Sequence, residues 1–339
     1  MWRWIMRRPE TSTFVVTIIL AVYFWATAPA FGTSANLHTL SIQIAATGIV
    51  ALGLALVLIC AEIDLSVGQT FAFAPIVMSI AIDNGLPLVP AIIVGLLAAG
   101  VVGVVNGAVT VYLRVHSFLT TLGTFFLING LNVTLTNGFP KNTPETNIVT
   151  NSMGAGQTNY SEFIWFAVLV ILFHLLLTRT RWGIHTFATG GNLNGAREAG
   201  VRIDRIKIGN FVLCAMMGGL AGILEAFRIQ SIDPLSGGAA VMFLGVSAAV
   251  IGGTSLLGGS GTMIGAFFGA SVLALLQDGF NLKGISAYTF DIILGIAILA
   301  AVTLNVYVTK LRTRVRPARR GRERTARSQT TAPTGGGEA

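Results

Sequence analysis

Charged side chains are scarce in this chain of 339 residues, of which 11% are charged and 53% are hydrophobic. A soluble domain usually contains about 25% charged residues, so the composition excludes a water-soluble globular protein. The sequence has long hydrophobic runs, whereas soluble proteins alternate polar and apolar residues. Six runs are near or above the length that crosses a bilayer: 14–31, 40–61, 86–113, 117–135, 208–227 and 288–309.

Motifs for nucleotide binding and hydrolysis are also missing. The sequence contains no GxxxxGK[ST] loop, which would hold the phosphates of ATP, and neither HExxH nor GxSxG. It has four histidines and two cysteines, and Cys60 and Cys214 both lie in apolar surroundings, so we expect neither a disulfide nor a metal site. These absences argue against an enzyme and against a nucleotide or other cofactor bound by this chain.

The positive charge is concentrated at the C-terminal end. The last thirty residues carry nine of the 22 basic side chains but two of the 14 acidic ones, so most of the net charge of +8 lies there. A basic run after the last apolar run is typical of a cytoplasmic anchor rather than of a nucleic-acid-binding surface. We expect the tail 310–339 to be disordered, because it has many like charges and almost no large apolar residues.

The distribution of Lys and Arg predicts the orientation of the chain in the membrane. Basic residues place both the N-terminal segment 1–13 and the C-terminal tail in the cytoplasm, together with the loop 179–207. The polar loop 136–160 has one Lys and no Arg, so it faces outside. The sequence therefore predicts an all-α polytopic helix bundle over 14–309, with ten spans at 14–31, 40–61, 67–82, 88–112, 117–136, 161–178, 208–228, 238–253, 262–277 and 289–309.

Two polar interruptions divide these apolar segments. The first, CAEIDLSVG at 60–68, contains Glu62 and Asp64, which we expect either to mark a functional site inside the membrane or to lie at its surface. Asp64 or Ser66 is a candidate cap for the helix that follows. The second, GGTSLLGGSGTMIG at 252–265, has six glycines, which disfavour a regular helix. One broken or re-entrant segment in each half of the chain is typical of internally repeated transporters.

The cytoplasmic loop contains a further short element, GNLNGAREAGV. Asn192 is a candidate N-cap and Gly200 a candidate C-terminal residue of a short helix that carries Arg197 and Glu198. Such a helix is too short to be stable alone. We therefore expect it to be supported by its own spans and by a soluble partner.

Four stretches together resemble the ribose/xylose-type permeases, the membrane subunits of bacterial ATP-binding cassette sugar importers. They are EIDLSVG (62–68), GGNLNGAREAGVRIDRIKI (190–208), GGTSLLGGSGTMIG (252–265) and NLKGISAY (281–288). The resemblance covers about 40–309. Two positions depart from it, because CAE precedes IDLSVG where the family is commonly Gly-rich, and Glu198 follows Arg197 where the family has a small or apolar residue.

The resemblance implies a multi-pass protein of the bacterial inner (plasma) membrane that forms a path for a sugar or related small polar solute. The implied partners are a cytoplasmic ATPase that uses ATP, an external sugar-binding protein, a second permease chain in a homo- or heterodimer, and membrane lipid, but no nucleic acid. The stretch expected to contact the ATPase comprises Gly191, Asn192, Ala196, Arg197, Glu198 and Gly200.

Two further sets of residues are candidates for the transport path. The broken segments supply a possible gate, made of Glu62, Asp64, Ser66, Gly68, Gly253, Thr254, Ser255, Gly258 and Gly259. Hydroxyl and amide side chains inside the spans suit a sugar, and they are Gln43, Thr47, Asn106, Thr120, Thr121, Thr124, Asn129 and Asn132. Each of these can instead bond only to a neighbouring helix. An ion-coupled secondary transporter that uses Glu62 and Asp64 is the alternative reading.

Overall fold

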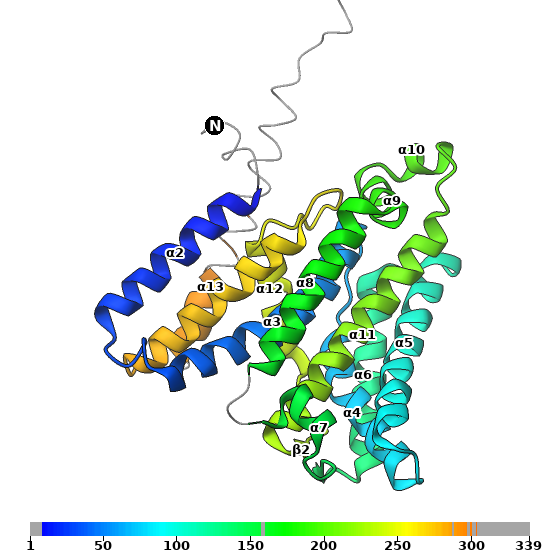
Figure 1. Ribbon diagram of the computed structural model, residues 1–339. Coiled ribbons are helices and arrows are strands. Elements are labelled where there is room, and N and C mark those ends of the chain that lie inside the picture. Colours follow the sequence, from blue (N-terminus) through cyan, green and yellow to red (C-terminus); the bar gives the residue numbers. More distant parts are fainter. Residues whose placement is uncertain (1–8, 157–159, 287, 297–298, 300–302, 304–339) are drawn as a thin grey trace, which may run out of the picture.

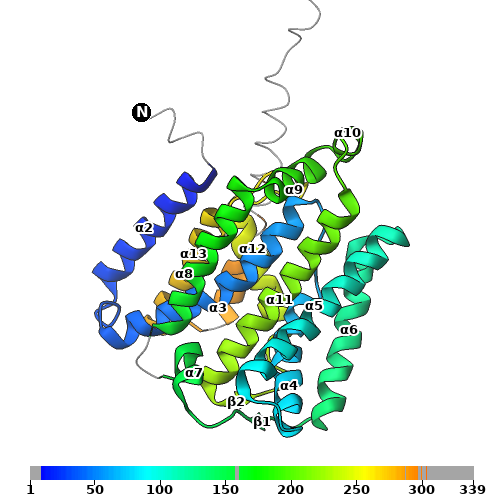
Figure 2. The same cartoon turned by 45° about the vertical axis from the view of Figure 1, so that its right-hand side comes forward.

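The computed structural model is a bundle of long helices that run roughly side by side (Figures 1 and 2), and it describes residues 9–156, 160–286, 288–296, 299 and 303. The long and medium helices are α2 (Pro9–Thr27), α3 (Ser34–Ile59), α4 (Val67–Asp83), α5 (Leu88–Tyr112), α6 (Ser117–Thr136), α8 (Ser161–Arg179), α9 (Arg181–Gly191), α11 (Ile203–Ile229), α12 (Gly238–Ile251) and α13 (Met263–Leu282). The short elements are β1 (Lys141–Asn142), α7 (Ile148–Thr150), the π-helix η1 (Asn151–Ala155), α10 (Leu193–Glu198) and β2 (Ser231–Ile232).

The bundle has two distinct ends. We call the end that carries α9, α10 and the connection 252–262 the loop end (Figure 1). We call the opposite end the strand end, because β1 and β2 pair there in an antiparallel ribbon, Lys141 opposite Ile232 and Asn142 opposite Ser231. The helices connect the two ends, so each polar loop of the chain lies at one of them.

Seven of the described helices are long and apolar enough to cross a membrane, namely α2, α3, α5, α6, α8, α11 and α13. The apolar helices α4 and α12 are shorter. At 1.5 Å per residue they are about 25 Å and 21 Å long, less than the about 30 Å of a hydrocarbon core. As straight helices these two runs are therefore too short to cross the hydrocarbon core, whereas α13 is long enough.

Most predicted boundaries agree with the helices, and four helices differ, among them α3, which begins at Ser34 instead of 40. The first helix begins at Pro9 and ends at Thr27 rather than at 14 and 31, so it starts inside the segment assigned to the N-terminus. Helix α11 begins at Ile203 instead of 208, and α13 extends to Leu282 instead of 277. Of the tenth predicted span, 289–296 is helical; most of its remainder and the tail 310–339 lie outside the described residues.

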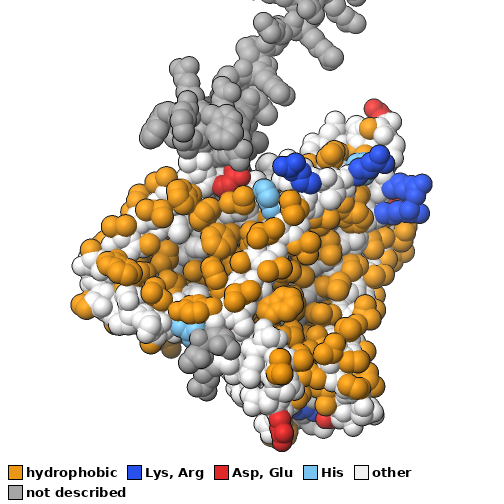
Figure 3. Space-filling view, viewed as in Figure 1, with side chains coloured by type: hydrophobic (Ala, Val, Ile, Leu, Met, Phe, Trp, Pro, Cys, Tyr) orange, Lys and Arg blue, Asp and Glu red, His pale blue; other side chains and the backbone are white. Residues whose placement is uncertain are grey.

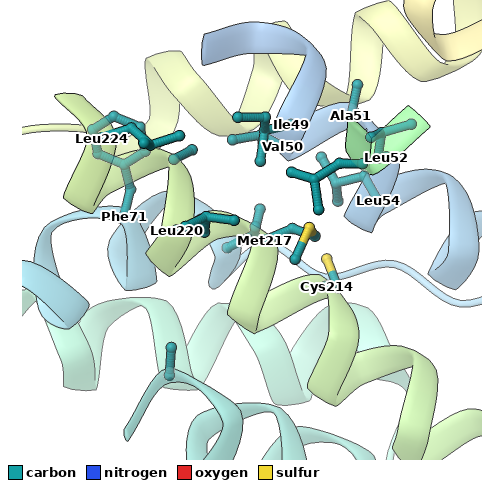
Figure 4. Packing of buried hydrophobic residues seen from close by; sticks show 14 of the residues in the cluster. Ile49, Val50, Ala51, Leu52, Leu54, Phe71, Cys214, Met217, Leu220 and Leu224 are labelled. Atoms are coloured by element: carbon teal, nitrogen blue, oxygen red, sulfur yellow. The ribbon is translucent and has the colours of Figure 1, made fainter. Parts of the chain in front are cut away.

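Helix α11 forms the centre of the bundle and packs against α3, α4 and α5. Figure 4 shows aliphatic side chains of α3 and sulfur-containing and aliphatic side chains of α11 meeting in this core. Small residues allow the backbones to approach: a Cβ at Gly103 of α5 would lie 2.5 Å from the Phe211 carbonyl oxygen, and one at Gly107 2.7 Å from Ile208 Cα. Close backbone packing of this kind stabilises helices in lipid, where water expulsion contributes little.

The short helices α4 and α12 begin next to each other and run in opposite directions. A Cβ at Gly68 would overlap the Gly238 carbonyl oxygen, so the first turns of the two helices touch. From this crossing α4 runs to the strand end, where Asp83 binds Lys141 at 2.8 Å. Helix α12 runs to the loop end, where 252–262 follows it. Each is preceded by non-helical chain, as expected for the discontinuous helices of inverted transporter repeats.

The surface agrees with a membrane location. Hydrophobic side chains cover the flank of the bundle across several helices in Figure 3, and most of the visible Lys and Arg side chains gather near α9 and α10. Exposed hydrophobic residues include Ile19, Val101, Phe126 and Ile171, from four different helices. A soluble monomer does not expose an apolar surface of this extent.

Candidate functional site

The segment 61–66 crosses part of the bundle without helical hydrogen bonds, so its backbone groups need other partners. Side chains of α6 supply two of them. Ser117 Oγ accepts a hydrogen bond from the Ile63 N–H at 3.2 Å, and the Thr121 hydroxyl donates to the Ile63 carbonyl at 3.4 Å. Two of the hydroxyl residues of α6 therefore hold the broken segment in place.

Asp64 organises the turn into α4. Its side chain is fully buried, and Oδ1 accepts hydrogen bonds from the Ser66 N–H at 2.9 Å and from the Ser66 hydroxyl at 2.7 Å. Asn106 of α5 donates to Ser66 Oγ at 2.8 Å. Of the two candidate caps, Ser66 occupies the N-cap position but makes no side-chain cap bond, whereas Asp64 accepts the Ser66 N–H at the start of α4. Asp64 is thus buried within the bundle and accepts hydrogen bonds through one of its two carboxylate oxygens.

Glu62 forms a different kind of contact. Its carboxylate pairs with Lys207 of α11, and both side chains are largely buried, with 12% and 15% of their surfaces exposed. The pair joins the start of the broken segment to the start of the central helix at the loop end. Because a largely buried charge is stable only when it is paired, this contact accounts for a carboxylate at position 62 without an ion-binding role.

The second interruption forms a tight turn at the loop end. The Ser255 N–H donates to the Ser260 carbonyl at 2.9 Å, and the Gly258 N–H donates to the Ser255 carbonyl at 3.1 Å. Gly253, Gly258 and Gly259 all have positive φ, between +72° and +95°, a conformation that glycine adopts at no steric cost. This turn follows α12 directly, so both broken segments lie next to short helices.

The predicted helix of the long loop is present as α10. Asn192 Oδ1 accepts a hydrogen bond from the Gly195 N–H at 3.0 Å, and Gly200 has a φ of +80°, so the predicted N-cap and C-terminal residue are confirmed. Ala196 is buried, whereas Arg197 and Glu198 are exposed. Helix α10 thus rests on the bundle through its small residue and presents its charged residues outward.

Three loop-end segments meet at a contact that we call the glycine junction, made of Ile59–Ala61, Gly190–Gly191 and Gly258–Gly259. The Gly259 N–H donates to the Ile59 carbonyl at 2.8 Å. A Cβ at Gly190 would overlap that same carbonyl oxygen, and one at Gly258 would lie 2.7 Å from Ala61 Cβ. The glycine junction therefore joins the end of α9, just before α10, to both broken segments through backbone contacts.

A cavity of about 240 Å³, lined by both polar and apolar side chains, lies between α3, α4, α11, α12 and α13. Gln43 and Thr47, two of the predicted path residues, line it. The other predicted path residues are among the described residues but do not line it. They are Asn106, Thr120, Thr121, Thr124, Asn129 and Asn132.

The path residues outside the cavity have local partners in most cases. Asn132 donates to the Gln69 carbonyl at 3.2 Å, and Thr124 donates to the Thr120 carbonyl one turn back in α6 at 3.0 Å. Asn129 is partly exposed on α6. The structure thus brings together Gln43 and Thr47, while Asn106, Thr121 and Asn132 stabilise the segment around 63–69.

Several residues of these sites were not selected from the sequence. Lys207 was counted among the cytoplasmic positive charges, yet it pairs with Glu62. Glu225 and Arg228 line the cavity and bond to each other. Two opposite charges three residues apart inside an apolar run are a signal that the sequence does contain. Gly190 carries no such signal, because its role depends on backbone packing.

The sequence is similar to known membrane transport proteins over most of its length. Residues 36–302 match the family model described as the permease component of the branched-chain amino acid transport system. The xylose/arabinose import permease of Sulfolobus acidocaldarius is 37% identical over 90% of this chain and 87% of its own. The ribose import permease of Escherichia coli is 32% identical over 89% and 94%. The autoinducer 2 import system permease of Photorhabdus luminescens is 35% identical over 75% and 76%.

No solved structure is significantly similar to the chain. The match to the family model covers most of the described bundle, and the chain belongs to this family of transport-system permease components. It is a multi-pass permease subunit of the bacterial inner (plasma) membrane and not an enzyme, and separate subunits hydrolyse the ATP. The ion-coupled reading based on Glu62 and Asp64 is therefore disfavoured, in agreement with their structural contacts.

Proposed function

We propose that this chain is the permease of an importer for a monosaccharide, driven by a partner ATPase and supplied by an external binding protein. Its relatives are described as permeases for xylose/arabinose and for ribose. The observation that carries the proposal is the glycine junction, which joins the end of α9, just before α10, to both broken segments. A docking surface attached to the two discontinuous helices is what an importer requires if a soluble motor is to move its transport path.

The proposal also includes the orientation of the chain in the membrane. We place the loop end and both termini in the cytoplasm and the strand end outside, with ten spans in all. Most of the visible positive charge lies near α9 and α10 (Figure 3), which agrees with the excess of Lys and Arg in cytoplasmic loops. The ATPase then contacts α10 through Gly191, Asn192, Ala196, Arg197, Glu198 and Gly200, and the binding protein meets the strand end.

The proposal also includes a gate that is formed by the two broken segments. Movement of α10 acts through Gly190 on Ile59 and on Gly259, and thus on the segments that precede α4 and follow α12. We assign the gate to Glu62, Asp64, Ser66, Gly68, Gly253, Thr254, Ser255, Gly258 and Gly259. This chain binds no nucleotide or metal of its own in the proposal, and it pairs with a second permease chain.

Uptake of radiolabelled D-xylose, L-arabinose and D-ribose tests the proposal. The chain is expressed in cells without endogenous pentose importers, together with the ATPase and the binding protein encoded in its own genome. We expect uptake of at least one sugar when all components are present and background uptake when the ATPase or the binding protein is omitted. Background uptake of all three sugars by the complete set, with every subunit in the membrane fraction, would refute the sugar assignment.

A further inference from the structure

Polar and apolar side chains together line the cavity between α3, α4, α11, α12 and α13. Six of its eleven lining residues are polar or charged, and they are Gln43, Thr47, Glu225, Arg228, Ser236 and Gln277. Its volume of about 240 Å³ is below the about 300–1,000 Å³ typical of drug-sized ligands. The cavity therefore suits a solute no larger than a single sugar ring.

The charged groups of the cavity do not favour an anion. Arg228 Nε donates to Glu225 Oε2 at 2.9 Å, and its Nη2 bonds to the other carboxylate oxygen. Glu162 of α8 lies 3.8 Å from the same guanidinium. Two carboxyl groups surround one guanidinium, so the cluster has no net positive charge, whether Glu162 is ionised or protonated. An anionic solute would meet a carboxylate here without a free cation to neutralise it.

The other polar residues of the cavity are suited to the uncharged hydroxyl groups of a solute. The Gln43 Oε1 atom is buried and has no hydrogen-bond partner among the described residues, and a buried acceptor of this kind is costly unless a ligand or water donates to it. Gln277, Thr47 and Ser236 add amide and hydroxyl groups that both donate and accept. This set of groups recognises a polyol.

The cavity lies toward the strand end of the bundle. A solute that enters from that end would reach the cavity before the transport path opens to the cytoplasm. Its residues come from the strand-end parts of α3 and α11 and from the first turns of α12. Further toward the loop end, α3 and α12 are in close contact. A Cβ at Gly245 of α12 would lie 2.7 Å from Val50 Cγ1 and 2.9 Å from Leu54 Cδ1 of α3. The apolar packing of these two helices closes the cavity toward the loop end.

We propose that this cavity is a resting site for the transported solute, and that it admits uncharged polyols and rejects sugar acids and sugar phosphates. The inference rests on the proposed sugar-import function. Gln43 and Gln277 bind hydroxyl groups, and the Glu162–Arg228–Glu225 cluster supplies the selection against negative charge. The apolar contact between Val50, Leu54 and Gly245 opens when the partner ATPase acts.

Thiol labelling tests the site in the purified full chain in lipid nanodiscs. The native cysteines Cys60 and Cys214 are both buried, so a Thr47→Cys variant provides the main site for a small hydrophilic methanethiosulfonate reagent. We expect D-xylose, L-arabinose or D-ribose to slow the labelling at least about twofold, and the anionic D-xylonate to leave it unchanged. Phe126→Cys, on the exposed side of α6, is the matched control that no solute protects.

Uptake by the complete transporter provides the second measurement. We expect Gln43→Leu to lower sugar uptake about tenfold, the equivalent of losing about one hydrogen bond to the solute. Thr178→Leu, which removes an exposed hydroxyl group that bonds only to the His174 carbonyl within α8, should stay within about twofold of wild type. Purification of each variant with its ATPase confirms that the subunits still assemble.

The outcomes separate the two proposals. Equal protection by xylose and xylonate overturns the selection against negative charge. Absence of protection by all three sugars, with normal uptake by the Gln43→Leu transporter, overturns the resting site but leaves the import function intact. Failure of the complete wild-type transporter to take up any of the sugars overturns the import function, and the inference with it.

Discussion

At the scale of single residues, Arg197 is the exposed cation of α10. An Arg in this position can make several charge-assisted hydrogen bonds to carboxylates or carbonyls of a partner. We expect Arg197→Glu to weaken binding of the ATPase by about 1–3 kcal/mol, which is about a 5- to 150-fold loss of affinity. Co-purification of the ATPase at equal permease expression measures the effect.

The matched control for this prediction is Arg205→Glu, which makes the same charge change at an exposed position on the first turn of α11. If positive charge at the loop end matters only for orientation in the membrane, the two variants should behave alike. Undiminished co-purification of the Arg197→Glu permease, together with normal ATP-driven uptake, would remove this residue from the interface.

The Glu62–Lys207 pair gives a second residue-scale prediction. Because both side chains are largely buried, removing one partner leaves an uncompensated charge. We expect Lys207→Met to lower the free energy of unfolding by about 3 kcal/mol, and Glu62→Gln combined with Lys207→Met to recover most of that loss. Thermal unfolding in detergent measures the variants and gives the coupling energy of the pair.

The exposed pair Asp83–Lys141 at the strand end is the control. Its atoms are 2.8 Å apart, but 60% of the Asp83 side chain is exposed, so Lys141→Met should cost less than about 1 kcal/mol. Equal losses for Lys141→Met and Lys207→Met would show that burial does not govern the Glu62–Lys207 pair. Full recovery by the double variant is not required, since the neutral side chains do not reproduce the packing of the original ones.

At the scale of helices and loops, the glycine junction carries the clearest prediction. A Cβ at Gly190 would overlap the Ile59 carbonyl oxygen and lie 2.9 Å from the Gly259 nitrogen, whereas at Gly191 the nearest atom is 3.8 Å away. We expect Gly190→Ala to reduce uptake by the complete transporter severely, because the end of α9, which leads into α10, can no longer pack against both broken segments. Gly191→Ala should transport normally.

The measurement for this pair compares sugar uptake with ATPase co-purification. If the junction transmits movement, Gly190→Ala keeps its ATPase bound and loses uptake. If the junction is only structural, the variant loses ATPase binding and uptake together. Normal uptake by Gly190→Ala would contradict the coupling route through these contacts.

The helices also show which features the sequence predicts well. Helix α6 begins at Ser117 and ends at Thr136, as predicted, because His116 and Asn137 occupy its cap positions outside the apolar run. Helix α13 extends beyond its predicted end because Asp278 is buried and accepts a hydrogen bond from Asn36 at 2.8 Å, so its polar last turns stay helical. Apolar runs thus predict where a span lies, but paired polar residues lengthen it.

The functional sites were predictable to a smaller extent, for a physical reason. Asn192 and Gly200 have local roles at the ends of α10, and local roles are visible in a short stretch of sequence. The contacts of Lys207 with Glu62 and of Gly190 with Ile59 join segments more than a hundred residues apart. Such contacts depend on which helices are neighbours, and a single sequence does not contain that information.

At the scale of the whole molecule, the two short helices decide what kind of transporter this is. Helices α4 and α12 start at one crossing and run to opposite ends of the bundle, an arrangement that ion-coupled transporters also use, with carboxylates at the break as ion sites. Here the two carboxylates of the first break have structural partners: Glu62 pairs with Lys207, and Asp64 accepts hydrogen bonds from Ser66. The buried Asp64 Oδ2 atom has no hydrogen-bond partner among the described residues, so it is the family membership, with ATP hydrolysed by separate subunits, that assigns the energy source to another subunit.

We therefore expect the purified chain, reconstituted alone in liposomes, to accumulate no D-xylose, L-arabinose or D-ribose under an inward proton or sodium gradient. Accumulation should appear when its ATPase and binding protein are added with ATP, and ionophores that collapse either gradient should not diminish it. Proteoliposomes that contain the complete transporter without ATP are the control for passive leakage. Gradient-driven accumulation by the chain alone would contradict the structural reading of Glu62 and Asp64, because those carboxylates would then have to exchange their protein partners for a proton or a cation during transport.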